Sequence, residues 1–112
     1  MFTDNYIITQ FIYINEGSEQ DFLKFEETVL PLLPKYNGKL MYRIRPQKES
    51  FIYPTGDEQP YEVHVVSFEA KEDFLNYKND PVRIEYLHLG TGSIKKIIMI
   101  EGQDLSAGGK SE

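Results

Sequence analysis

The amino-acid sequence predicts a small α+β domain with an antiparallel sheet, and three observations lead to this prediction. Its segments follow the order strand, helix, strand, strand, helix, strand. Apolar residues occupy both alternating sets of positions in the strand segments, so neither face of the sheet suits water. The helical segments suffice to cover only one face. Together these features indicate a ferredoxin-like βαββαβ fold with its helices on one face of the sheet.

The composition limits the class of protein. A chain of 112 residues suits one hydrophobic core, and we expect a single domain over residues 1–102 and a flexible tail over 103–112. The net charge of -6 argues against a nucleic-acid partner, and the absence of cysteine excludes disulfides and thiolate chemistry. No run of about 20 apolar residues and no signal-like N-terminal region is present. We therefore expect a cytoplasmic protein without a membrane partner.

The first half of the chain is expected to form a strand, a helix and a second strand. Residues 5–14 are rich in β-branched and aromatic side chains, as strands are. Ser18 and Asp21 resemble a capping box, which predicts that a helix begins there. The apolar stripe of this helix comprises Phe22, Phe25, Val29 and Leu32 or Leu33. The charged residues expected mainly on its other side are Lys24, Glu26 and Glu27. A turn then leads to a strand over residues 39–45.

The second half begins with a long polar connection over residues 46–60, a length that is often functional or flexible. The elements expected after it are a strand over 61–68, a helix over 71–78 and a strand over 94–100. Between the last two, Asp80 is a good N-cap and Pro81 suits the first position of another helical segment. Gly90 is expected to end that segment.

The strand pattern also predicts a partner. On the first strand, Ile8, Ile12 and Ile14 would face one side, and Ile7, Phe11 and Tyr13 the other. The third strand repeats this pattern, with Val63 and Val65 on one side and Val66 and Phe68 on the other. Nothing in the chain remains to cover the second side. We therefore expect a homodimer in which two sheets pack face to face. The alternative is a monomer that tolerates apolar residues on one exposed face.

The residues best suited to chemistry lie on the predicted second and third strands. His64 can serve as an acid or a base near neutral pH, and Glu62 lies two residues earlier on the same side. Arg43 and Arg45 share a side of the second strand, and Lys39 is expected farther along that side. A histidine, a carboxylate and an arginine together suit proton transfer at a carboxylate- or enolate-bearing substrate. The alternative is a purely structural histidine that is hydrogen-bonded to Glu62, beside ordinary ion pairs of the two arginines.

Other candidate residues carry weaker signals. Tyr13 and Tyr42 could offer phenolic groups to a ligand, although aromatic residues on strands more often pack. His88 is expected to be an exposed helix position. The sequence shows no convergent cluster of histidine and carboxylate ligands, so we expect neither a metal nor another cofactor.

Three segments resemble a known superfamily. "YNGKLMYR", "VVSFEAKEDFLNYKNDPVRIEY" and "IIMIEG" are similar to the dimeric α/β-barrel superfamily of ferredoxin-like proteins over about residues 5–102. The similarity is closest to a branch of unknown function and more distant to monooxygenases of the antibiotic-biosynthesis type. The resemblance implies two possibilities that the fold alone does not separate. The favoured one is a non-catalytic dimeric module for small-ligand binding or assembly. The alternative is a cofactor-independent oxygenase or isomerase with His64 as acid or base and Arg43 as an anion clamp.

Overall fold

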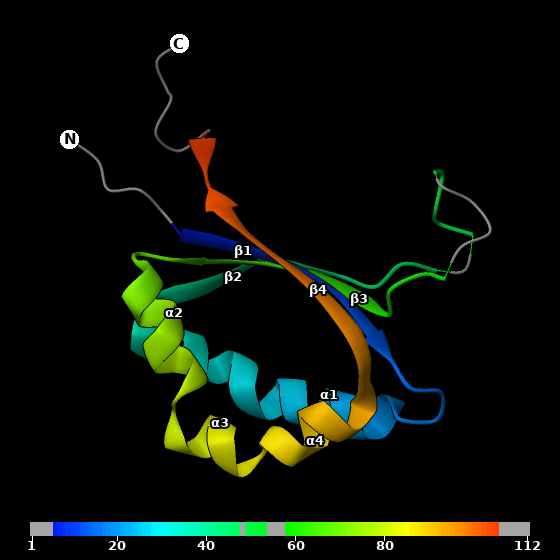
Figure 1. Cartoon of the computed structure of the whole chain (residues 1–112), viewed down its shortest axis with the longest axis horizontal. Helices are drawn as coiled ribbons and strands as arrows, with labels where there is room; N and C mark the ends of the chain where they lie inside the picture. The colour runs from blue at the N-terminus through cyan, green and yellow to red at the C-terminus, as the bar shows by residue number, and fades with distance from the viewer. Residues whose placement is uncertain (1–5, 48, 54–57, 106–112) are drawn as a thin grey trace.

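A computed structural model describes residues 6–47, 49–53 and 58–105, and in it four antiparallel strands form one twisted sheet (Figure 1). The strands are β1 (Tyr6–Ile14), β2 (Gly38–Ile44), β3 (Glu62–Phe68) and β4 (Ile94–Gln103). Their order across the sheet is β2-β3-β1-β4, which places β1 and β3 at the centre. This is the strand order of a ferredoxin-like fold, so the predicted fold class is confirmed.

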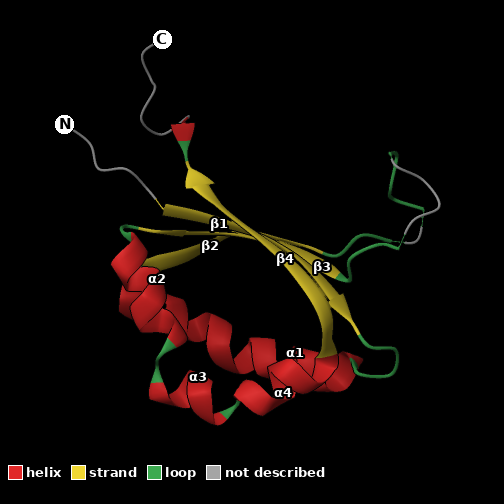
Figure 2. Ribbon diagram, viewed as in Figure 1, coloured by secondary structure: helices red, strands yellow, loops and turns green. Residues whose placement is uncertain are grey.

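The helices all lie on one face of the sheet (Figure 2). They are α1 (Glu19–Val29), a 3-10 helix η1 (Leu30–Tyr36), α2 (Lys71–Lys78), α3 (Pro81–Glu85) and α4 (Leu87–Ser93). None of the helices in the described ranges is long and apolar enough to cross a membrane. The predicted bounds of α2 agree with the structure, whereas β4 extends three residues beyond the predicted end.

The start of α3 is built as predicted, and α1 begins directly after Ser18 as predicted but without the expected capping box. The Asp80 carboxylate accepts hydrogen bonds from the backbone amides of Val82 (2.8 Å) and Arg83 (3.2 Å), as an N-cap does. Ser18 precedes α1, yet its hydroxyl makes no capping hydrogen bond. Its backbone, at φ -102° and ψ 14°, departs from the extended conformation typical of an N-cap. The predicted capping box with Asp21 is therefore wrong.

The prediction that Gly90 ends a helix is also wrong, because Gly90 lies inside α4. Its role is to permit a close approach between helices. A Cβ atom at this position would lie 2.9 Å from Cε2 of Phe25, closer than side-chain carbons normally approach. The missing side chain lets α4 pack directly against the Phe25 ring of α1.

The core lies between the sheet and the helices. Alternate residues of β1 and β3 point toward the helices, and the buried apolar set comprises Ile8, Ile12, Phe22, Phe25, Val29, Leu33, Val66, Phe68 and Tyr77. The predicted apolar stripe of α1 is thus confirmed. Glu26, which was expected on the solvent side of α1, is instead only 5% exposed. It follows Phe22 by four residues and precedes Val29 by three, so it belongs to the same helix face.

A β-bulge in β2 corrects one predicted side-chain direction. The pairing register of β2 with β3 shifts within residues 40–42. Lys39 lies opposite Ser67, whereas Arg43 lies opposite His64. Since directly opposite residues of an antiparallel pair point to the same face, Arg43 points toward the helices and Lys39 points away from them. The extra residue in the bulge therefore overturns the expectation that these two side chains share a face.

The face of the sheet away from the helices is apolar and open. Its most exposed apolar residues are Tyr42, Ile44, Ile98 and Ile100, which are 43–60% exposed. Half-buried residues between them are Ile7, Phe11, Val63 and Val65. No described helix covers this face (Figure 1). Part of the connection over 46–60, at residues 48 and 54–57, and residues 106–112 of the predicted tail lie outside the described residues.

Candidate functional site

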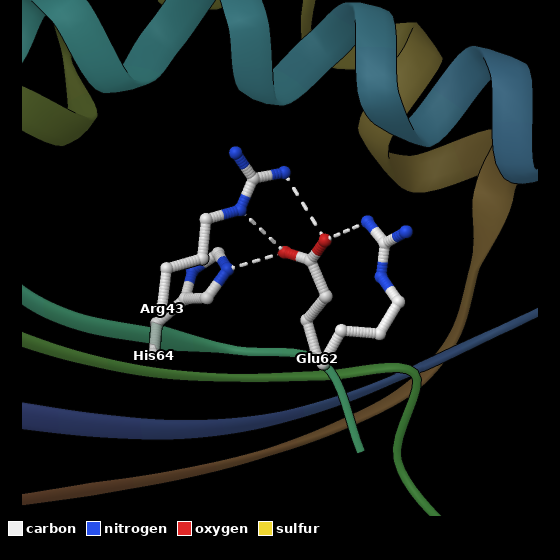
Figure 3. A network of polar contacts seen from close by, with 4 residues as sticks. Arg43, Glu62 and His64 are labelled. Carbon is white, nitrogen blue, oxygen red and sulfur yellow. Dashed lines mark hydrogen bonds and ion pairs between the residues drawn. The ribbon is translucent and has the colours of Figure 1, made fainter. Parts of the chain in front are cut away.

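Glu62 is the centre of a polar network on the helix-facing side of the sheet (Figure 3). Its carboxylate accepts two hydrogen bonds from Arg43, from Nε at 2.8 Å and from Nη2 at 3.1 Å. It also forms an ion pair with Nη2 of Arg45 and a 2.7 Å hydrogen bond with Nε2 of His64. Four of the six predicted site residues therefore meet. Glu62 and His64 are 1% and 2% exposed, so the network is anchored inside the protein.

The electrostatics of this network fix the charge of Glu62. Burial alone would raise the pKa of Glu62, but hydrogen bonds from His64, Arg43 and Arg45 outweigh burial and lower the pKa to about 2. The carboxylate is therefore ionised at neutral pH. The hydrogen bond to Glu62 in turn raises the pKa of Arg43. Because the ionised carboxylate only accepts, Nε2 of His64 carries the proton of the hydrogen bond between them.

The two arginines lie where the network reaches the surface. Their side chains are 35% exposed at Arg43 and 45% exposed at Arg45. The Arg45 guanidinium lies 4.3 Å from the centre of the Tyr61 ring, a cation–π arrangement that orders its side chain. Both arginines share one carboxylate, so the group of two arginines and Glu62 has a net charge of +1 without His64.

The structure separates the two predicted tyrosines from His64. Tyr42 lies opposite Val65 on the open face of the sheet and is 60% exposed. Tyr13 follows the alternation of Ile7 and Phe11 onto that same face, and the Lys96 ammonium lies 4.4 Å from its ring centre. Neither tyrosine is among the residues that line the cavity beside His64. His88 is exposed, as expected.

A cavity of about 120 Å³ lies between the sheet and the helices. Its apolar lining includes Phe25, Val29, Leu33, Val66, Phe68 and Phe74. Its polar lining comprises Gln10, Glu26, His64, Tyr77, Lys78 and Arg83. For comparison, an apolar protein cavity of about 150 Å³ holds benzene. The space therefore suits one small organic molecule.

Glu26 is the site residue that sequence reasoning missed. It projects from α1 into the cavity lining, and no residue in the described part of the chain forms a hydrogen bond with its carboxyl group. Burial raises the pKa of Glu26 to about 7, while the charge of His64 opposes this shift and that of Glu62 reinforces it. The signal that could have found it is its spacing from Phe22 and Val29, which places a charged residue in an apolar stripe.

Arg83 faces the same cavity from α3. Its guanidinium lies 5.8 Å from the ring centre of Phe25 and 5.2 Å from that of Tyr77. Its Nη1 donates to the backbone carbonyl of Lys78 at 3.3 Å. Its Nε is buried and has no hydrogen-bond acceptor among the residues that the structure describes. The cavity therefore contains an unused donor as well as the unpaired carboxyl of Glu26.

The described part of the chain offers no metal site. Within residues 6–47, 49–53 and 58–105, no group of three or more histidine, cysteine, aspartate or glutamate side chains is arranged to hold an ion. The chemistry that the described arrangement can support is hydrogen bonding and proton transfer at a small bound molecule.

Comparisons with known proteins agree on the fold. No family model matches the chain, and no curated protein matches it. Among solved structures, a protein of unknown function from Rhodopseudomonas palustris is similar with a TM-score of 0.80 and 12% identity, over 92% of this chain and 84% of that chain. A dimeric protein of unknown function with a ferredoxin-like fold, from Bacteroides fragilis, matches with a TM-score of 0.66 and 9% identity, over 89% and 96% of the two chains.

A third similar structure is a proposed antibiotic biosynthesis monooxygenase from Nitrosomonas europaea. It has a TM-score of 0.67 and 9% identity, and the match covers 94% of each chain. At such identities the likeness establishes a shared backbone fold and does not extend to chemistry. This chain therefore has a ferredoxin-like α+β fold, in agreement with the resemblance seen in its sequence.

Proposed function

We propose that this protein is a homodimer in which each subunit binds one small organic molecule in the cavity between sheet and helices. The observation that supports this most strongly is the composition of the cavity wall. Aromatic and aliphatic side chains surround a few polar groups, contributed by Gln10, Glu26, His64 and Arg83. Ligand sites in proteins commonly combine an apolar wall with a small number of polar groups that orient the ligand.

The lining also indicates where a ligand enters. Ile97 and Met99 of β4 line the cavity and are nevertheless 38% and 47% exposed. They therefore lie where the cavity meets solvent, together with the exposed Lys78 of α2. A ligand of about the size of one six-membered ring fits the volume, with its apolar part against Phe25, Phe68 and neighbouring rings.

Blocking the entrance tests this proposal. Met99→Trp places a large ring at the mouth of the cavity, and Leu75→Trp adds the same ring to an exposed α2 position outside it. Saturation-transfer NMR with a library of ring-sized neutral compounds should identify binders. We expect Met99→Trp to abolish their binding and Leu75→Trp to leave it unchanged. Binding that survives Met99→Trp at full strength would place the ligand elsewhere.

The homodimer is supported by the open apolar face of the sheet. A second copy of the same face would cover residues such as Val65, Ile98 and Ile100, and large exposed apolar patches are uncommon on monomers. The similar Bacteroides fragilis protein is described as dimeric. Light scattering at micromolar concentration should give twice the chain mass. Val65→Asp should give the single-chain mass, whereas Leu75→Asp should keep twice the chain mass. A single-chain mass for the unaltered protein contradicts the proposed homodimer.

A second candidate function is a cofactor-independent enzyme that transfers protons at the bound molecule. The observation that favours it is the position of His64, which lines the cavity while its Nε2 is hydrogen-bonded to the Glu62 carboxylate. Once an activity is detected, His64→Gln should abolish turnover and keep the dimer mass. Full turnover in that variant would remove His64 from the chemistry.

A further inference from the structure

Two polar groups in the cavity wall lack the partners that buried groups normally have. Glu26 is 5% exposed, and its carboxyl forms no hydrogen bond with any residue that the structure describes. Nε of Arg83 is buried and equally without an acceptor in that part of the chain. The great majority of buried polar groups in proteins are hydrogen-bonded, so an exception needs an explanation. Glu26 and Arg83 both line one cavity, so a molecule bound there would lie beside both side chains.

The two groups differ in what they offer. Arg83 supplies a fixed N–H donor with a permanent positive charge, held between the rings of Phe25 and Tyr77. Glu26 supplies a carboxyl group that can accept or return a proton. Removal of a proton next to a carbonyl group needs two functions: a base that accepts the proton and a donor that binds the carbonyl oxygen. Glu26 can supply the first and Arg83 the second.

We propose that Glu26 moves a proton to and from the carbon next to the carbonyl group of a neutral, enolisable ligand, while the Arg83 guanidinium binds the carbonyl oxygen. This proposal rests on the proposed ligand cavity. It assigns the acid–base role to Glu26 of α1, which the sequence did not single out, and it names the ligand by its chemistry. The predominantly apolar wall favours a neutral ring-sized ketone over a charged compound.

The step balances without any further reactant. The C–H bond next to the carbonyl breaks, and its proton moves to a carboxylate oxygen of Glu26. The electron pair of that bond forms a carbon–carbon double bond, and the carbonyl oxygen becomes an enolate oxygen that accepts a hydrogen bond from Arg83. Return of the proton to the same carbon regenerates the ligand, and return to a conjugated carbon moves a double bond. Neither an oxidant nor a reductant is consumed.

The charged surroundings of Glu26 support this role. Glu26 interacts electrostatically with several titratable groups. They are His64 and Glu62 of β3, Arg43 of β2, Tyr77 of α2 and Arg83 of α3. Burial outweighs the favourable charges and raises the pKa of Glu26 to about 7. A carboxyl with this pKa populates both protonation states near neutral pH, which is the condition for efficient proton transfer.

Deuterium exchange tests the proposal without knowledge of the natural ligand. Cyclohexanone and cyclopentanone are incubated with the whole protein in D₂O, and NMR follows loss of the proton signals next to the carbonyl group. We expect exchange above the buffer rate, with a rate that rises with pH through about 7 as Glu26 ionises. Glu26→Gln should lower the protein-dependent rate by at least about 100-fold, and Arg83→Met by about 100-fold or more.

The controls separate this proposal from folding and from ligand binding. Glu27→Gln, at the adjacent exposed position, should keep the rate, and Glu26→Asp should keep part of it. Saturation-transfer NMR measures ketone binding in the same samples. The ligand cavity is supported if Met99→Trp abolishes ketone binding. If the protein then fails to accelerate exchange, or if Glu26→Gln leaves the exchange rate unchanged, the proposed role of Glu26 is wrong and the ligand cavity is retained. Absence of any cavity-dependent ketone binding would overturn both.

Discussion

Replacing Glu62 by Gln tests the account of the polar network most sharply. Glutamine has nearly the size and shape of a protonated glutamate, so the variant removes the negative charge and retains the packing. In the variant, the guanidinium groups of Arg43 and Arg45 face a neutral amide, whereas in the unaltered protein each forms an ion pair with a carboxylate. The variant should therefore be less stable than the unaltered protein at neutral pH.

The magnitude follows from the pKa of Glu62. Lowering this pKa from 4.5 to about 2 corresponds to about 3 kcal/mol of additional stability for the ionised folded state. The two arginine side chains are 35% and 45% exposed, so solvent screens part of the attraction, and we expect a loss of about 2 kcal/mol. Because the folded pKa lies below the unfolded value, this stabilisation is complete above about pH 4.5 and is lost as the pH falls toward 2.

Urea unfolding at one fixed protein concentration measures the effect. At pH 7 the free energy of unfolding of Glu62→Gln should be lower by about 2 kcal/mol, and at pH 3 the difference should fall below half of that. Glu69→Gln, one residue beyond the end of β3 and exposed, should change the stability by less than about 0.5 kcal/mol at either pH. A Glu62→Gln variant as stable as the unaltered protein at pH 7, or a difference that does not shrink at pH 3, refutes the reasoning.

Three further predictions concern stability. Because the pKa of Glu26 is raised to about 7, the unaltered protein loses stability as the pH rises from about 4.5 to 7. Glu26→Gln should therefore be more stable than the unaltered protein by up to about 3 kcal/mol at pH 8 and equally stable at pH 4.5. Urea unfolding that shows no such pH trend contradicts this prediction. Gly90→Ala should lower the free energy of unfolding by about 1–3 kcal/mol, because its Cβ atom would collide with the Phe25 ring. Gly92→Ala in the same helix, where the added Cβ meets open space, should leave the thermal midpoint of unfolding unchanged. Asp80→Ala should lower the thermal midpoint of unfolding more than Asp80→Asn, because asparagine keeps an oxygen that can cap α3. An equal decrease in midpoint for the two variants would show that the cap does not stabilise the protein.

The fold could be predicted from sequence because its determinants are local. Strand segments of β-branched and aromatic residues, the apolar stripe from Phe22 to Leu33 and the Asp80-Pro81 helix start each act over a few residues. The pairing of Glu62 with His64 was equally accessible, since residues two apart share a face of a strand. Arg43 joined them because the neighbouring strand places it opposite His64, and Arg45 follows directly after β2 and forms an ion pair with Glu62 at the start of β3.

Most of what was missed depends on contacts between distant segments, and Glu26 is the exception. Glu26 was assigned to solvent from its charge alone, although its spacing placed it in the apolar stripe. Lys39 was assigned to the wrong face because a β-bulge leaves no clear mark in the local pattern. The role of Gly90 and the position of Arg83 at the cavity depend on how α3 and α4 pack against Phe25, which a linear sequence does not disclose.

We propose above that the space between sheet and helices is the binding site of this protein. Titration of ¹⁵N-labelled protein with cyclohexanone, followed by two-dimensional NMR, tests it most directly. We predict that the largest amide shifts occur at cavity residues such as Gln10, Glu26 and His64 and that they saturate. Shifts confined to the open face of the sheet, at residues such as Tyr42 and Ile98, or no saturable shifts at all, would contradict the claim.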